Sequence, residues 1–155
     1  MQTNKSLYAI AATRIALGFI FLWSFFDKTF GLGFSTASGK AWLDGVSPTG
    51  YYLSKMTAGP LAGFYHSIAG SPVVDWLFML GLLGIGLSLF LGILIRWGAI
   101  AGTVLTILLG LTVFPPTNNP LIDNHAVYAL FLIAVSLSAE HKLSLQNIFK
   151  KSNAS

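Results

Sequence analysis

The chain has 155 residues, of which 54% are hydrophobic and 9% are charged, against roughly 25% charged in an ordinary soluble domain. A soluble fold of this size could not bury so much apolar surface, so the composition favours a single membrane domain (residues 1–155) with a lipid bilayer as its solvent. The formal net charge of +4 comes from scattered basic residues beside apolar runs, which does not indicate a nucleic-acid partner, and the lack of cysteine excludes disulfides and thiolate-held metal centres.

The first predicted membrane span covers residues 7–26 and is interrupted only by Arg14. Ten of its residues are Leu, Ile or Phe, each of which favours insertion by roughly 0.3–0.6 kcal/mol. Their sum of about 3–6 kcal/mol outweighs the cost of roughly 2.5–3.5 kcal/mol for one central arginine. We therefore expect this segment to cross the bilayer despite its charge.

Residues 28–74 form a long connection that is rich in glycine and proline and interleaved with aromatic side chains. So many aromatic residues are unusual in a solvated linker. The apolar content of residues 51–68 indicates a short interfacial or re-entrant helix that is too short to cross. We expect this outer loop to fold back over the helices as a lid.

Three further spans are predicted, at residues 76–95, 97–114 and 121–139, and the first of these is bracketed by Asp75 and Arg96. Only Arg96 separates the second span from the third, so these two must form a tight helical hairpin. Residues 140–155 follow as a basic, amphipathic surface tail. The sequence thus predicts an all-α membrane protein, a four-transmembrane-helix bundle with a long outer loop between its first two helices.

Small residues recur at every fourth position in the second and third spans. They are Gly84, Ser88 and Gly92 in the second span, and Gly98 and Gly102 in the third. Such spacing lets helix backbones approach closely in lipid, although glycine is also common in membrane helices in general. We read these positions as packing signals.

The distribution of Lys and Arg predicts the orientation in the membrane. One side holds Lys5, Arg96, Lys142, Lys150 and Lys151, and the other holds Lys28, Lys40 and Lys55, all within the long loop. The positive-inside rule then places both termini in the cytoplasm of a multi-pass protein of the cell membrane.

The fourth span is too short for the bilayer unless polar residues are drawn inward. Residues 126–139 are uncharged and make about 21 Å of helix, against about 30 Å of hydrocarbon. Asp123 and His125 are then pulled to the level of the acyl chains, where Asp27 and Lys28 end the antiparallel first span. The four side chains would form a polar pocket in which His125 exchanges protons. Alternatively, the two pairs only cap helix ends and pin the loop.

Arg14 is the other charge placed deep in a span. Counting along the antiparallel fourth span puts Glu140 at a comparable depth, which predicts a structural ion pair between Arg14 and Glu140. The alternative is that Arg14 binds an anionic group or a lipid head. No metal site is predicted, because His125 and His141 lie at opposite ends of one helix; a bis-His site from His66 and His125, which could meet, is the weak alternative.

Several runs resemble one family of membrane proteins. They are R-I-A-L-G-F-I-F-L-W from Arg14, D-K-T-F-G-L-G-F from Asp27, W-L-D-G-V-S-P-T-G from Trp42, L-G-L-L-G-I-G-L before Arg96, and N-P-L-I-D-N-H ending at His125. In this order they are similar to the DoxX/DoxD-like integral membrane proteins. The resemblance implies a four-helix membrane bundle. Members of the family include the small membrane subunit of thiosulfate:quinone oxidoreductase, which works with a second subunit and passes electrons to quinone.

Three functions remain open from the sequence. In the first, the chain is a quinone-interacting membrane subunit of an oxidoreductase. Trp23, Phe26 and Phe30 would form the walls of the quinone site, and His125 with Asp27 or Asp123 would exchange protons with the quinone. Alternatively, it is a non-catalytic anchor or scaffold in a larger membrane complex with other membrane or peripheral subunits. A transporter is the third reading, although no inverted repeat or paired broken helices are visible.

Overall fold

The computed structural model describes residues 4–116, 122–138 and 142–146, and within them every regular element is helical. The elements in chain order are α1 (Asn4–Phe30), the 3₁₀ turn η1 (Trp42–Asp44), the π-helical turn η2 (Tyr52–Met56), α2 (Ala62–Ile68), α3 (Pro72–Leu91), α4 (Ile95–Thr112) and α5 (Asn124–Leu137). The all-α class predicted from the sequence is confirmed.

Three of these helices, α1, α3 and α4, are long and apolar enough to cross a membrane, and they correspond to the first three predicted spans. Helix α5 has 14 residues, or about 21 Å of helix against about 30 Å of hydrocarbon. It is shorter than the predicted fourth span, whose limits at residues 121 and 139 lie outside the described residues. Most of the predicted amphipathic tail, residues 147–155, also lies outside them.

Helix α3 begins and ends about four residues earlier than the predicted span 76–95. Pro72 stands in its first turn, where a missing backbone N–H costs nothing. Gly92 ends it with a φ of 73°, in the left-handed region that glycine adopts most easily. The sequence prediction treated Asp75 as the edge of the span, but this residue is buried within the first turn of the helix. Three residues then join α3 to α4, which confirms the tight hairpin.

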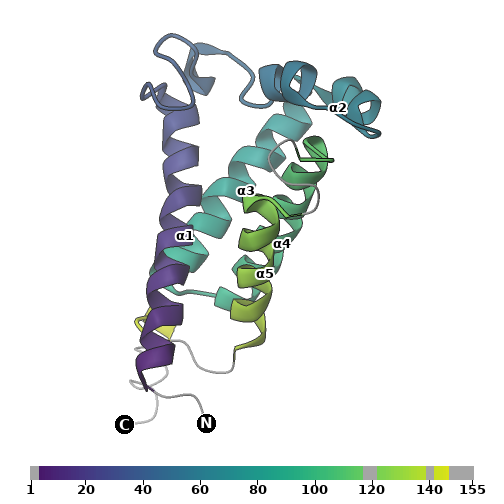
Figure 1. Ribbon diagram of the computed structural model, residues 1–155. Helices are drawn as coiled ribbons and strands as arrows, with labels where there is room; N and C mark the ends of the chain where they lie inside the picture. The colour runs from purple at the N-terminus through teal and green to yellow at the C-terminus, as the bar shows by residue number, and fades with distance from the viewer. Residues whose placement is uncertain (1–3, 117–121, 139–141, 147–155) are drawn as a thin grey trace.

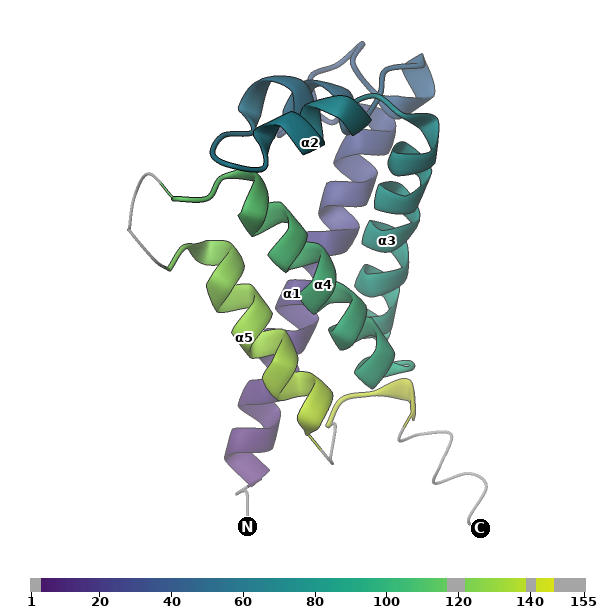
Figure 2. The same cartoon turned by 90° about the vertical axis from the view of Figure 1, so that its right-hand side faces the viewer.

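Helices α1, α3, α4 and α5 run alternately up and down, and each packs on the next: α1 on α3, α3 on α4, and α4 on α5 (Figures 1 and 2). Helices α1 and α5 meet only over a short stretch. We call the end covered by residues 31–71 the loop end, and the opposite end, where α1 begins, the terminal end. All four helices contribute to one apolar core: Leu17 and Phe21 from α1, Met79, Leu82, Ile85 and Leu89 from α3, Ile95 and Ala99 from α4, and Leu132 and Val135 from α5.

Glycines set the distance between α1 and α3. A Cβ added to Gly18 would lie 2.5 Å from the backbone nitrogen of Phe90, and one added to Gly86 would lie 2.7 Å from the side chain of Leu22. Because hydrophobicity gives no association force between helices in lipid, close packing of this kind must hold the pair together. Gly18 was not among the small residues singled out from the sequence.

The predicted small-residue spacing holds in part between α3 and α4. A Cβ on Gly98 would lie 2.5 Å from the Cβ of Ser88, so these two residues do allow a close crossing. The side chains of Ile85 and Leu132 likewise pack on Gly102, where an added Cβ would lie 3.1 and 3.0 Å from them. Gly84 differs, since nothing lies within 4 Å of an added Cβ there, and it faces outward.

The connection between α1 and α3 lies across the loop end, with η2 and α2 over the end of α4 (Figure 2). The hydroxyl of Tyr52 is hydrogen-bonded to that of Thr112 at 2.8 Å, and Tyr65 donates to the carbonyl of Leu108 at 3.0 Å. The backbone N–H of Ala58 donates to the Thr112 carbonyl at 2.8 Å. The loop therefore folds back over the helices, and the short helix expected within residues 51–68 is present as α2.

Candidate functional site

Asp27 is almost fully buried, with 1% of its surface exposed, at the end of α1. Its Oδ1 accepts the Phe34 backbone N–H at 3.1 Å, and its Oδ2 accepts the backbone N–H and the hydroxyl of Ser35 at 3.0 and 2.6 Å. These bonds hold the start of the long loop against the last turn of the helix, as expected for a residue that pins the loop. The neighbouring Lys28 is half-buried.

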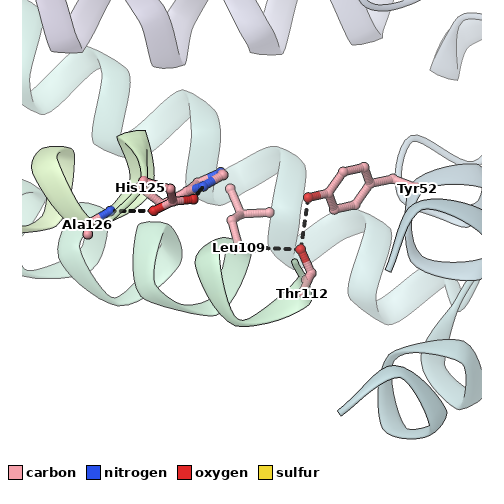
Figure 3. A network of polar contacts seen from close by, with 6 residues as sticks. Tyr52, Leu109, Thr112, His125 and Ala126 are labelled. Atoms are coloured by element: carbon pink, nitrogen blue, oxygen red, sulfur yellow. Dashed lines mark hydrogen bonds and ion pairs between the residues drawn. The ribbon is translucent and has the colours of Figure 1, made fainter. Parts of the chain in front are cut away.

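Asp123 and His125 form a second polar pair at the start of α5 (Figure 3). Asp123 is the N-cap and accepts the Ala126 backbone N–H at 3.0 Å through Oδ1, while its Oδ2 lies 2.6 Å from Nδ1 of His125. The Asp123 carboxylate therefore caps the first turn of α5 with one oxygen and holds the imidazole ring with the other.

The His125 side chain is 23% exposed and packs against α4. A Cβ added to Gly110 of α4 would lie 3.2 Å from the Cβ of His125. Because a carboxylate only accepts hydrogen bonds, the bond to Asp123 places the proton of a neutral imidazole on Nδ1. Nε2 is then the proton acceptor, and no hydrogen bond from the described residues occupies it. Figure 3 shows this pair at the same end of α4 as the bond between Tyr52 and Thr112.

The structure does not bring the four predicted pocket residues together. No hydrogen bond or ion pair within the described residues joins Asp27 or Lys28 to Asp123 or His125. In Figures 1 and 2 the start of α5 lies apart from the end of α1, because α1 packs along α3 rather than along α5. Within the described residues, therefore, no contact joins the two halves of the predicted pocket: Asp27 is bonded to Phe34 and Ser35, and Asp123 to His125 and Ala126.

The aromatic residues predicted as quinone walls lie on the outer surface of α1. Phe26 and Phe30 are stacked at 6.3 Å between ring centroids and are 42% and 55% exposed. Trp23 packs against Phe34 with centroids 5.0 Å apart, which places it beside the long loop. Neither of these two contacts puts a ring next to His125.

Arg14 is 1% exposed and lies beside the turn between α3 and α4. Its guanidinium donates to the carbonyl of Leu89 in the last turn of α3, and to the carbonyls of Lys142 and Leu143 at 3.4 and 2.8 Å. The predicted partner, Glu140, lies outside the described residues. The carbonyls at a helix C-terminus attract a cation, so these contacts support the structural role expected for Arg14.

Two features of the loop end were missed from the sequence. Asp75, predicted only to bracket a span, is 6% exposed and accepts hydrogen bonds from Ser47 and Thr49. Trp42 and Trp76 pack edge to face with centroids 4.6 Å apart. The signal available in the sequence was a tryptophan in the W-L-D-G run and an acid–tryptophan pair at the start of an apolar helix. Within the described residues, no three His, Asp or Glu side chains gather into a metal site.

Within the described residues the protein is all-helical, and three of its apolar helices are long enough to span a lipid bilayer. Comparison with protein-family models, curated proteins and solved structures finds no match.

Proposed function

We propose that the chain is an integral membrane subunit of the DoxX/DoxD-like type, working with other subunits in a quinone-linked oxidoreductase. The observation that carries the proposal is the bond between Asp123 and Nδ1 of His125 beside the end of α4. It gives a partly exposed imidazole a fixed tautomer at the boundary of an apolar helix pair. A quinone head group needs such a hydrogen-bonding and proton-exchanging side chain next to apolar surface.

In this proposal, His125 binds a carbonyl or hydroxyl oxygen of the quinone through Nε2, and Asp123 orients the ring. A bound quinone supplies two-electron, two-proton chemistry, with electrons delivered by a partner subunit. Nε2 of His125 takes the proton from a quinol hydroxyl, and the Asp123 carboxylate, bonded to Nδ1, faces the ring that receives it. The walls proposed from the sequence do not fit this site, so the apolar surface is that of α4 and α5 around Leu109 and Gly110.

The proposal includes the membrane topology. Helix α5 crosses as the fourth span, with Asp123 and His125 at one boundary and Lys142 at the other. Both termini then lie in the cytoplasm, and the loop end faces the outer side of the cell membrane. Tags on either terminus should be protected from externally added protease in intact cells, whereas a tag after Lys40, on the exposed loop, should be cleaved. Cleavage at a terminus in sealed cells would contradict this orientation.

Quinone binding can be measured by quenching of tryptophan fluorescence when decylubiquinone is added to the full chain in nanodiscs. We expect His125→Ala to weaken binding by about tenfold or more, because a buried hydrogen bond to a chargeable group is worth roughly 1.5–3 kcal/mol. His66→Ala is the matched control, since His66 is an exposed imidazole on α2 at the same end. Equal quenching in wild type and His125→Ala would overturn the proposal.

The exposed face of α3 favours the alternative of a non-catalytic anchor or scaffold. Side chains at heptad spacing stay exposed along this helix: Val73, Leu77, Leu80, Leu87 and Leu91, with Gly84 among them. A partner helix could pack closely at Gly84. Under this alternative, Gly84→Leu should abolish stoichiometric co-purification of partner subunits while the chain itself stays folded. Co-purification that is insensitive to Gly84→Leu would count against this face.

A further inference from the structure

A shallow pocket of about 270 Å³ lies at the loop end, between η1 and the start of α3. It is lined by Trp42, Ser47, Asp75 and Trp76, together with Gly45, Val46, Gly70 and Pro72. The His125 pair is not part of it. Its size is below the roughly 300–1,000 Å³ of pockets for drug-sized ligands, so it suits a small chemical group.

The carboxylate of Asp75 is the charged group of this pocket. Three hydrogen bonds converge on its Oδ1: the Ser47 hydroxyl at 2.8 Å, the Thr49 backbone N–H at 3.3 Å, and the Thr49 hydroxyl. No donor among the described residues reaches Oδ2, and Oδ2 is not among the buried polar atoms that lack a partner. One oxygen is therefore fixed by the loop, while the other remains open to the pocket.

The two tryptophans provide the rest of the site. Trp42 and Trp76 are in edge-to-face contact at 73°, so their two rings together form one aromatic corner in the wall of the pocket. Aromatic faces attract cations, and tryptophan does so most strongly. A carboxylate oxygen beside two indole rings is the combination of groups that recognises an organic ammonium ion.

The local charge excludes an anion. The N-terminus of α3 contributes roughly half a positive charge, which the full negative charge of Asp75 exceeds. Asp44, exposed on η1, adds a second negative charge next to the pocket. The lysines of this end are Lys28, Lys40 and Lys55, and none of them lines the pocket. An anion would have to approach the buried carboxylate directly and lose its hydration.

We propose that this pocket binds a small organic ammonium group, primary or methylated, between Trp42, Trp76 and Oδ2 of Asp75. Two sources carry this chemistry, a lipid head group with choline or ethanolamine and a free amine. The position of the pocket at a helix end, where tryptophans mark the boundary of a bilayer, is accessible to both.

The probe is tetramethylammonium chloride, and its binding to the full chain in detergent is followed by saturation-transfer NMR of the methyl protons, with sodium chloride keeping the ionic strength constant. We expect Asp75→Asn to weaken binding by about tenfold or more, because it removes the charge but keeps an oxygen that accepts from Ser47 and Thr49. Asp44→Asn is the matched control, since it removes one exposed negative charge nearby without lining the pocket.

A second variant keeps the test valid if Asp75→Asn does not fold. Trp76 is 56% exposed, so Trp76→Leu removes an aromatic wall with little loss of packing and should weaken binding about two- to fivefold. Tetramethylammonium that binds equally to wild type and both pocket variants, or not at all, would overturn the proposal.

The source is distinguished in nanodiscs of two compositions. If phosphatidylcholine nanodiscs suppress tetramethylammonium binding and phosphatidylglycerol nanodiscs do not, the ligand is the lipid head group. If binding is equal in both, the site takes a free amine. Both results support an ammonium site, and neither depends on whether His125 binds quinone.

Discussion

The crossing of α1 and α3 gives the most direct test of the fold. A Cβ on Gly18 would meet three backbone atoms of α3: the nitrogen and Cα of Phe90 at 2.5 and 2.9 Å, and the carbonyl carbon of Leu89 at 3.0 Å. Backbone atoms in a helix cannot turn aside as a side chain can. Gly18→Ala must therefore push the two helices apart by roughly 1 Å to restore normal contacts of about 3.5 Å.

Gly84→Ala is the matched variant, because Gly84 also lies within a long apolar helix but has nothing within 4 Å of the added Cβ. Both substitutions gain about 0.8–1 kcal/mol of helix propensity, and this gain cancels when the two variants are compared. What remains is the overpacking at Gly18, which costs about 1–3 kcal/mol. At about 2–4 °C per kcal/mol, Gly18→Ala should melt about 2–12 °C below Gly84→Ala.

Thermal unfolding of both variants can be followed by tryptophan fluorescence in the same detergent, since neither change touches a tryptophan. Gly86→Ala serves as a further check, because its Cβ would lie 2.9 Å from the backbone nitrogen of Leu22 at the same crossing. If Gly18→Ala melts at or above the temperature of Gly84→Ala, α1 and α3 do not cross at Gly18 and the reasoning is refuted.

Three further predictions concern the polar contacts. Asp123→Ala removes the N-cap of α5, whose carboxylate accepts the Ala126 backbone N–H, and should cost about 0.5–2 kcal/mol, seen as a lower melting temperature; an unchanged melting temperature would contradict it. Tyr65→Phe removes the donor to the Leu108 carbonyl and should cost about 0.5–1.5 kcal/mol, seen as faster protease cleavage of the loop; unaltered cleavage would argue against this contact. Arg14→Lys cannot reach carbonyls on both α3 and residues 142–146, so hydrogen exchange in residues 142–146 should accelerate, and unchanged protection would show that the guanidinium fork is not needed.

Local features of the chain account for what could be predicted correctly. The apolar run around Arg14 and the hairpin before Arg96 follow from hydrophobic length and from glycine and proline placement. The predicted pocket is a different case, because it required α1 and α5 to be neighbours at the loop end, and α1 packs along α3 instead. Its four residues are Asp27, Lys28, Asp123 and His125. Hydrophobic periodicity carries little information about which helix packs on which when all of them are apolar.

By itself, the sequence determined the all-α class, three apolar helices of membrane-spanning length, and the polar residues that interrupt or flank them. Only the tertiary structure decided the hydrogen-bond partners of those polar residues. Asp27 accepts from the loop that follows it, Asp75 accepts from Ser47 and Thr49, and Arg14 donates to backbone carbonyls. The physical reason is that hydrophobic length acts on each segment separately. A buried charge, by contrast, must be satisfied by whichever donors or acceptors the packing brings within about 3 Å.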